Sequence, residues 1–176
     1  MNIFTVTVNA PVGGPEPVFH DHHCWSDQQG GEWQPAAADA NVRTLTLPAL
    51  GNSGGLLYTL GPAPNNYFYV IVGRDVSGTF VHVRGNVPQY TTSQRLHREI
   101  YHFKGVRPSR AAANALVAYD ARFIQQHGNF IIEVVPTAPV GNNIAVAVNI
   151  LRMVVLPDIA PPNAPVNPAE VSSVCL

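Results

Sequence analysis

The chain has 176 residues, a length typical of a single domain, and 46% of its residues are hydrophobic while only 12% are charged. Its formal net charge is −1 and Lys104 is its one lysine, so it has no basic face with which to bind nucleic acid or an anionic membrane. Two cysteines are too few for a disulfide framework, and we expect both thiols to be reduced.

The N-terminus indicates a strand rather than a targeting signal. Residues 3–8 alternate between apolar and polar side chains and are rich in β-branched residues. A signal peptide or a transmembrane helix would need a continuous apolar run, which this segment lacks. We therefore expect a cytoplasmic protein.

The same period-two pattern recurs along the chain and, with 16 prolines and 14 glycines to form turns, predicts a mainly β fold. Six further strands are expected, at residues 43–47, 55–60, 66–73, 79–83, 129–135 and 143–156. Along the strand at 79–83, Phe80, His82 and the following Arg84 alternate with Val81 and Val83, which predicts one face exposed to water.

Residues 91–123 change to a helical period and predict two helices. Thr92 or Ser93 is expected to cap the first, which should end at Gly105. The second should open at Pro108 and carry Ala112, Leu116, Tyr119 and Phe123 on one face. The proline-rich residues 157–176 suit neither helix nor strand and are expected to form a tail beside a single domain over residues 1–156.

Residues 19–25, FHDHHCW, suggest a metal site. On a regular strand His20 and His22 would share one face, with Asp21 and His23 on the other. Two imidazoles are too few for a closed zinc site, which takes four ligands, and the sequence nominates no further ligand. We therefore assign no metal and no cofactor, and keep a metal-binding function as an alternative hypothesis.

Several segments in order resemble the fungal fruit body lectin family over about residues 2–152. They are FTVTV at 4–8, WSDQQGGEW at 25–33, GNSGGLLY at 51–58, NYFYVIVG at 66–73, REIY at 98–101, NALVAYD at 114–120 and FIIEVVPTAPVGNNIAVAVNI at 130–150. The resemblance implies an actinoporin-like β-sandwich of two sheets with an inserted helix-loop-helix. It also implies a tetrameric, non-enzymatic lectin, acting in defence, with two sugar sites per protomer.

One implied site binds galactosyl-N-acetylgalactosamine, the T-antigen disaccharide. Its family positions correspond here to Gln28, Leu50, Gly51, Asn52 and Asp75, together with Val76 or Ser77. Glycine lets sugar hydroxyls approach the backbone, and an aspartate accepts hydrogen bonds from them.

The other implied site binds terminal N-acetylglucosamine. Its positions correspond to His82, Gly85 and Tyr119, with Arg107 or Arg110 supplying the guanidinium. Tyrosine offers an apolar ring face and a hydroxyl, and arginine donates several hydrogen bonds.

A second alternative function is a membrane-active cytolysin, because pore-forming toxins share this sandwich. Such toxins need a detachable N-terminal segment long enough to span a bilayer as a helix, about 20 residues. The strand expected from residue 3 leaves no such segment, so we expect no membrane insertion.

Overall fold

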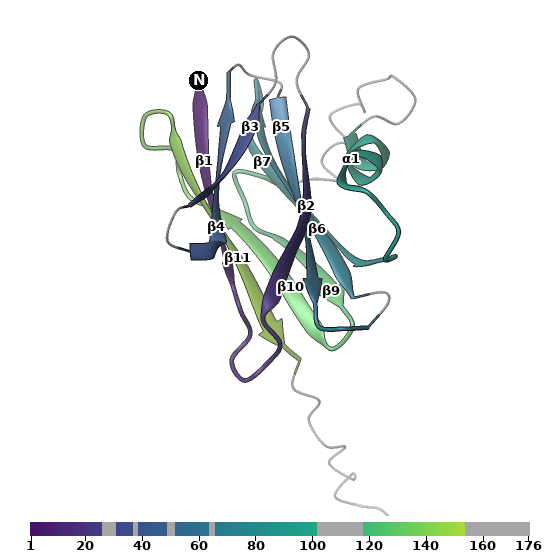
Figure 1. The fold of residues 1–176 in the computed structure, drawn as a ribbon. Helices are drawn as coiled ribbons and strands as arrows, with labels where there is room; N and C mark the ends of the chain where they lie inside the picture. Colours follow the sequence, from purple (N-terminus) through teal and green to yellow (C-terminus); the bar gives the residue numbers. More distant parts are fainter. Residues whose placement is uncertain (26–30, 37–38, 49–51, 64–65, 102–117, 154–176) are drawn as a thin grey trace, which may run out of the picture.

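The computed structural model describes residues 1–25, 31–36, 39–48, 52–63, 66–101 and 118–153. Two β-sheets pack face to face, and one helix lies on the outer side of one of them (Figure 1). The expected mainly β fold, a sandwich of two sheets, is confirmed.

The first sheet has six strands in the order β3-β4-β1-β11-β10-β9. Their bounds are Asn2–Asn9 (β1), Glu32–Ala36 (β3), Asp39–Leu47 (β4), Phe123–His127 (β9), Phe130–Pro136 (β10) and Asn143–Arg152 (β11). Strand β1 lies in the middle of this sheet, antiparallel to β4 and parallel to β11. The N-terminal strand thus joins the two halves of the sheet.

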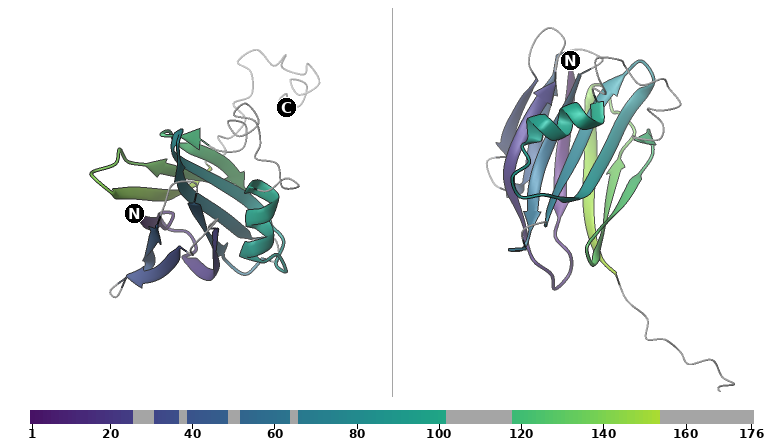
Figure 2. Two further views of the ribbon diagram at one scale, coloured as in Figure 1. Left: turned by 90° about the horizontal axis from the view of Figure 1, so that it is seen from above. Right: turned by 90° about the vertical axis from the view of Figure 1, so that its right-hand side faces the viewer.

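The second sheet has five strands in the order β2-β5-β6-β7-β8, and each neighbouring pair is antiparallel. Their bounds are Pro17–Trp25 (β2), Asn52–Leu60 (β5), Tyr67–Asp75 (β6), Gly78–Val87 (β7) and Ala118–Tyr119 (β8). Viewed from above, the two sheets form the two layers of the sandwich (Figure 2, left).

The main core fills the space between the sheets. In β1, Phe4, Val6 and Val8 are buried while the residues between them are not, as period two requires. The valines and isoleucines at alternate positions of β11 complete the other half of this layer. Trp33 from β3 closes the side of the core, and its indole N–H donates to the carbonyl of His23 at 3.3 Å.

A second apolar cluster lies on the opposite face of the β2-β5-β6-β7-β8 sheet. It consists of Leu57, Tyr69, Ile71, Phe80, Val87, Leu96 and Ile100. The last two come from helix α1, Ser93–Tyr101, which lies across this face (Figure 2, right). The prediction of one wet face is therefore wrong for residues 79–83, which are all buried, because Phe80 packs in this cluster and His82 packs against Phe123 of β9. Arg84, the next residue of that face, is exposed as predicted.

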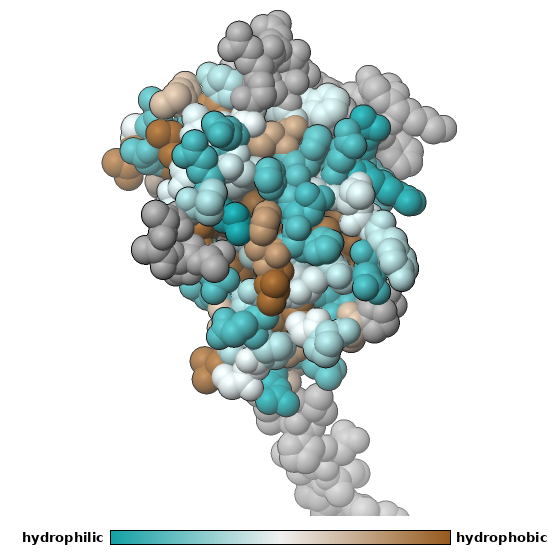
Figure 3. Space-filling model, in the orientation of Figure 1, coloured by the Kyte–Doolittle hydropathy of each residue, from teal (hydrophilic) through white to brown (hydrophobic). Residues whose placement is uncertain are grey.

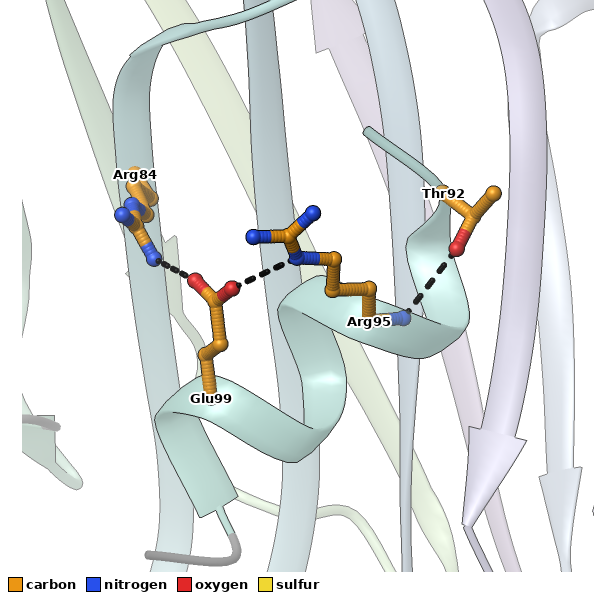
Figure 4. A network of polar contacts seen from close by, with 4 residues as sticks. All are labelled: Arg84, Thr92, Arg95 and Glu99. Atoms are coloured by element: carbon orange, nitrogen blue, oxygen red, sulfur yellow. Dashed lines mark hydrogen bonds and ion pairs between the residues drawn. The ribbon is translucent and has the colours of Figure 1, made fainter. Parts of the chain in front are cut away.

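Helix α1 begins where the sequence predicts. The backbone N–H of Arg95 donates to the Thr92 hydroxyl at 3.3 Å, so Thr92 is the N-cap (Figure 4). Glu99 accepts hydrogen bonds from Arg95, one turn earlier, and from Arg84 on β7. These contacts fix the exposed side of the helix to the sheet.

Replacing Glu99 with glutamine is expected to lower the free energy of unfolding by less than about 1 kcal/mol, because all three side chains of the network are well exposed to water. The loss should shrink further at high ionic strength. Urea unfolding at low and high salt measures it, with the exposed Glu16→Gln variant as control. A loss of several kcal/mol that salt does not change would contradict a surface role.

The second predicted helix is wrong at its C-terminal end. Tyr119 lies in strand β8, paired with Phe80, and Phe123 begins strand β9. Asp120 between them has a φ of 49°, a left-handed value that no α-helix continues through. Among the described residues four strands thus follow α1, where the sequence predicted two. The remaining part of that predicted helix and the tail at 157–176 lie outside the described residues.

Hydrophilic side chains dominate the surface in the view of Figure 3, with a narrow apolar strip down its middle. Among the residues that the structure describes, no helix has the length and apolar character that a membrane span requires.

Candidate functional site

Polar side chains gather at the end of the sandwich where β2 ends and β5 begins. Asn2, at the start of β1, and Asn52, at the start of β5, are each less than a tenth exposed. Arg74, the cross-strand partner of Asn52, donates to the Asn2 side-chain oxygen at 3.2 Å. We call this end of the sandwich, where β1 and β5 begin and β6 ends, the loop end, and it lies at the top of Figure 1.

The hairpin between β6 and β7 lies at the same end. Asp75 accepts a hydrogen bond from the backbone N–H of Ser77 at 2.7 Å, which closes the turn, and Val76 at its tip is 91% exposed. Asp120 packs against this hairpin and accepts from the backbone N–H of Thr79 at 3.0 Å. Hydrogen bonds therefore hold this hairpin in place, and the carboxylates of Asp75 and Asp120 lie beside it.

Four of the residues predicted for the T-antigen site lie at the loop end. They are Asn52, Asp75, Val76 and Ser77. The other three, Gln28, Leu50 and Gly51, lie outside the described residues. The four described residues of this predicted site thus lie together at one end of the β2-β5-β6-β7-β8 sheet.

The residues predicted for the N-acetylglucosamine site are distributed differently. His82 is 8% exposed, and its ring lies 4.6 Å from that of Phe123. Gly85 lies against β9, and a Cβ there would approach the carbonyl oxygen of Gln126 to 2.7 Å. The backbone of Tyr119 pairs with Phe80 in β8, while Arg107 and Arg110 lie outside the described residues. His82 and Gly85 both sit where β7 packs against β9.

Packing explains two glycines of the GNSGG segment. A Cβ on Gly54 would lie 2.6 Å from Leu45 and 2.8 Å from the Trp33 indole nitrogen, inside the core. A Cβ on Gly55 would overlap the hydroxyl and ring of Tyr69 on the opposite face. Side chains pack closely against both faces of β5 at these two positions. The packing therefore requires glycine there, whether or not a ligand approaches.

A β-bulge divides the histidines of β2. The register shifts between Phe19 and Asp21, so the expected sharing of one face by His20 and His22 is wrong. The ring of His22 stacks on Phe19, whereas that of His20 lies against Tyr67 on the helix side. Within the described ranges, no three His, Cys, Asp or Glu side chains are grouped to hold a metal ion.

Asp21 binds the start of helix α1. Its carboxylate accepts the backbone N–H of Ser93 at 3.1 Å, at the end of the helix that attracts negative charge. Burial opposes ionisation, but hydrogen bonds from the backbone N–H groups of Ser93 and His22 outweigh it and hold the pKa of Asp21 below its ordinary value. Cys24, a free thiol of β2, has its pKa raised to about 11 by burial and is therefore a poor nucleophile.

Sequence reasoning missed a buried polar chain beneath α1. The Ser53 hydroxyl and Nε2 of His97 share a hydrogen bond of 2.7 Å, and Nδ1 of His97 lies 3.2 Å from the Tyr69 hydroxyl. All three residues have 0% exposure. A serine beside a histidine suggests a nucleophile and its base, but no substrate can reach Ser53 in this arrangement. No local spacing signals the chain, because its members come from β5, β6 and α1.

Because two histidines are partly or fully buried, we expect the folded state to become less stable in mildly acidic solution. Burial, reinforced by the positive charge of Arg98, lowers the pKa of His23. Burial also lowers the pKa of His127, against a smaller opposing effect of the Asn66 backbone, and Nδ1 of His127 accepts the Asn86 N–H at 2.9 Å. Both folded-state pKa values lie below the ordinary 6.5, so the unfolded chain binds more protons as the pH falls below that value.

The two neutral histidines are therefore expected to make their full contribution to the free energy of unfolding above pH 6.5, and that contribution should decline as the pH falls below this value. Urea midpoints measured from about pH 7.5 down to about pH 5 test this, before carboxylate protonation dominates. In the His127→Asn variant, whose side-chain oxygen can still accept the Asn86 N–H, the decline should be smaller. An equally steep decline in that variant would exclude His127 as a source.

Comparison with known proteins shows the fold. No family model matches the sequence, and no curated protein matches it significantly. The crystal structure of the wild-type Xerocomus chrysenteron lectin XCL is similar, with 20% sequence identity and a TM-score of 0.68 over 85% of this chain and 98% of the lectin. A variant of that lectin with three methionine substitutions gives 21% identity and a TM-score of 0.67, over 85% and 97% of the two chains. The chain therefore has the β-sandwich fold of this fungal lectin, as the resemblance implied.

Proposed function

We propose that the protein is a non-enzymatic lectin that binds carbohydrate at the loop end. The observation that carries the proposal is the likeness in fold to the Xerocomus chrysenteron lectin over nearly the whole length of that lectin. The loop end adds neutral and acidic hydrogen-bonding groups without a surplus of positive charge. Such groups suit the hydroxyls of an uncharged sugar better than a phosphate.

The proposed ligands are galactosyl-N-acetylgalactosamine, terminal N-acetylglucosamine, or both. At the first site, Asn52 and the Asp75–Gly78 hairpin contribute the described residues. At the second, Tyr119 and an arginine of the segment before it are the proposed contacts. Each buried polar group left without a partner costs about 1–3 kcal/mol, so the choice of side chains at these positions determines which sugar is accepted.

We further propose that several copies act together, as a homotetramer in the cytoplasm with a defensive role. A single shallow sugar site typically binds at micromolar to millimolar concentration, about −4 to −8 kcal/mol. Several sites on one assembly raise the apparent affinity for a glycan-covered surface.

A glycan array with the wild type, Asp75→Asn and Tyr119→Phe tests the proposal. Asparagine retains an oxygen for the Ser77 N–H, so the hairpin should persist while the carboxylate is lost. We expect the wild type to bind and each variant to weaken the signal for one glycan class by about fivefold or more, as expected for one hydrogen bond to a charged or phenolic group. The absence of binding to any glycan by the wild type would refute the proposed function.

A further inference from the structure

The interface between α1 and the sheet contains buried polar contacts in addition to the apolar contacts that hold an amphipathic helix against a sheet. Leu96 and Ile100 already supply its apolar anchor. In addition, His97 from the middle of the helix is completely buried and contacts the hydroxyls of Ser53 and Tyr69. Burying three such groups is tolerated only because each has a partner.

The hydrogen bond to Ser53 reaches the loop end directly. Ser53 is the residue after Asn52 and the second residue of strand β5. Its side chain points to the helix, while that of Gly54 would point into the core. His97 therefore holds the backbone of β5 at the point where the strand enters the sheet.

Tyr69 and β2 hold His97 in turn. The Tyr69 hydroxyl lies over Gly55, the position in β5 where no side chain could be accommodated. The ring of His23 lies 5.4 Å from that of His97, nearly perpendicular to it, and Asp21 fixes the start of the helix. The imidazole thus has little room to rotate, which makes its bond to Ser53 directional.

We propose that His97 is a positioning residue: its hydrogen bonds to Ser53 and Tyr69 form a clasp that orders the first residues of β5 for ligand binding at the loop end. The link to ligand binding rests on the function proposed above, whereas the ordering of β5 does not. Helix α1 is then part of the binding apparatus although none of its described residues need touch the sugar.

A variant that removes all three polar groups together distinguishes an effect of His97 on the order of β5 from an effect on the stability of the fold. His97→Phe alone leaves two buried hydroxyls without partners and should destabilise the protein. The triple variant Ser53→Ala, Tyr69→Phe, His97→Phe removes all the polar groups together, and such matched replacements are often nearly neutral for stability. Ser53→Ala alone, which removes one oxygen, serves as a milder second variant.

The readouts are the melting temperature, amide hydrogen exchange of the full chain, and binding of galactosyl-N-acetylgalactosamine. In the triple variant we expect a melting temperature close to that of the wild type. Exchange at residues 52–55 should be about fivefold faster or more, with β11 unchanged, and sugar binding about fivefold weaker. Ser53→Ala should give a smaller change in the same direction.

Unchanged exchange at residues 52–55 in both variants would overturn the clasp. Faster exchange with unchanged sugar affinity would overturn its role in binding. If the wild type binds no glycan, the proposed function fails, and the exchange rates still decide whether the clasp orders β5.

Discussion

Truncating Phe68 to alanine is expected to lower the free energy of unfolding by about 3–5 kcal/mol, the largest single effect that we predict. The Phe68 ring is fully buried on the inner face of β6. Its ring stacks on that of Tyr58, with 5.5 Å between centroids, and makes a T-shaped contact with the ring of His127 from the opposite sheet, with 5.8 Å between centroids. The change therefore opens a cavity and breaks an aromatic contact between the two sheets.

Chemical unfolding of Phe68→Ala and of Leu151→Ala measures this effect. Leu151 is 51% exposed on the outer side of β11, so its truncation should cost less than about 1 kcal/mol. Phe68→Leu, which keeps most of the volume, should fall between the two. Equal losses for Phe68→Ala and Leu151→Ala would contradict the assignment of the core to the space between the sheets.

Replacing Gly55 with alanine is expected to cost about 1–3 kcal/mol or more, despite adding only a methyl group. The methyl would overlap the ring and hydroxyl of Tyr69, which is itself completely buried and cannot move aside freely. Burial raises the pKa of Tyr69 well above its ordinary value, so the hydroxyl stays protonated and available to His97. Displacing it would also disturb the clasp.

A double-mutant cycle with Tyr69→Leu tests the cause. If the overlap with the ring is responsible, Gly55→Ala should cost much less in the Tyr69→Leu background, and the coupling free energy should exceed about 0.5 kcal/mol. Thermal or urea unfolding of the four proteins supplies the numbers. Strictly additive costs would mean that Gly55 is required for a different reason.

The sequence predicted the strands with regular alternation well. Segments such as 3–8 and 66–73 carry β-branched and aromatic residues that leave little choice of structure, and both form strands close to the expected bounds. Strand β2 was harder to predict, because its histidines and its bulge interrupt the pattern. Phe123, the first residue of strand β9, was assigned to a helix because it continued the helical spacing of the residues before it, and the rest of that strand was not predicted.

The burial of residues 79–83 shows a different limit. Alternation predicts which residues share a face, but whether that face is wet depends on what packs against it. The outer face of the sheet at Phe80 packs with residues of α1, and β7 also packs against β9, and both elements come from later parts of the chain. Phe80 is buried in the cluster that includes Leu96 and Ile100, whereas the ring of His82 lies against Phe123 of β9, and their own segment reveals neither contact.

The candidate site was predictable only through resemblance to a family. No sequence motif links Asn52 with Asp75 and Ser77. The antiparallel pairing of β5, β6 and β7 brings these residues to the same end of the sheet. Conversely, the conspicuous FHDHHCW segment has a structural use that we can specify in part, since Asp21 and His23 contact helix α1. The Ser53–His97–Tyr69 chain could not be foreseen, because only the fold brings its three residues together.

The most direct test of the central claim is a glycan array that compares two tryptophan substitutions in turns at opposite ends of the sandwich. Val76 is 91% exposed at the loop end, and Val12 is 97% exposed in the turn between β1 and β2. We predict that the wild type and Val12→Trp bind the same glycans, and that Val76→Trp changes binding by about tenfold or more, equivalent to about 1.4 kcal/mol. No glycan binding by the wild type, or identical binding by the wild type and both variants, would contradict a lectin that binds sugar at the loop end.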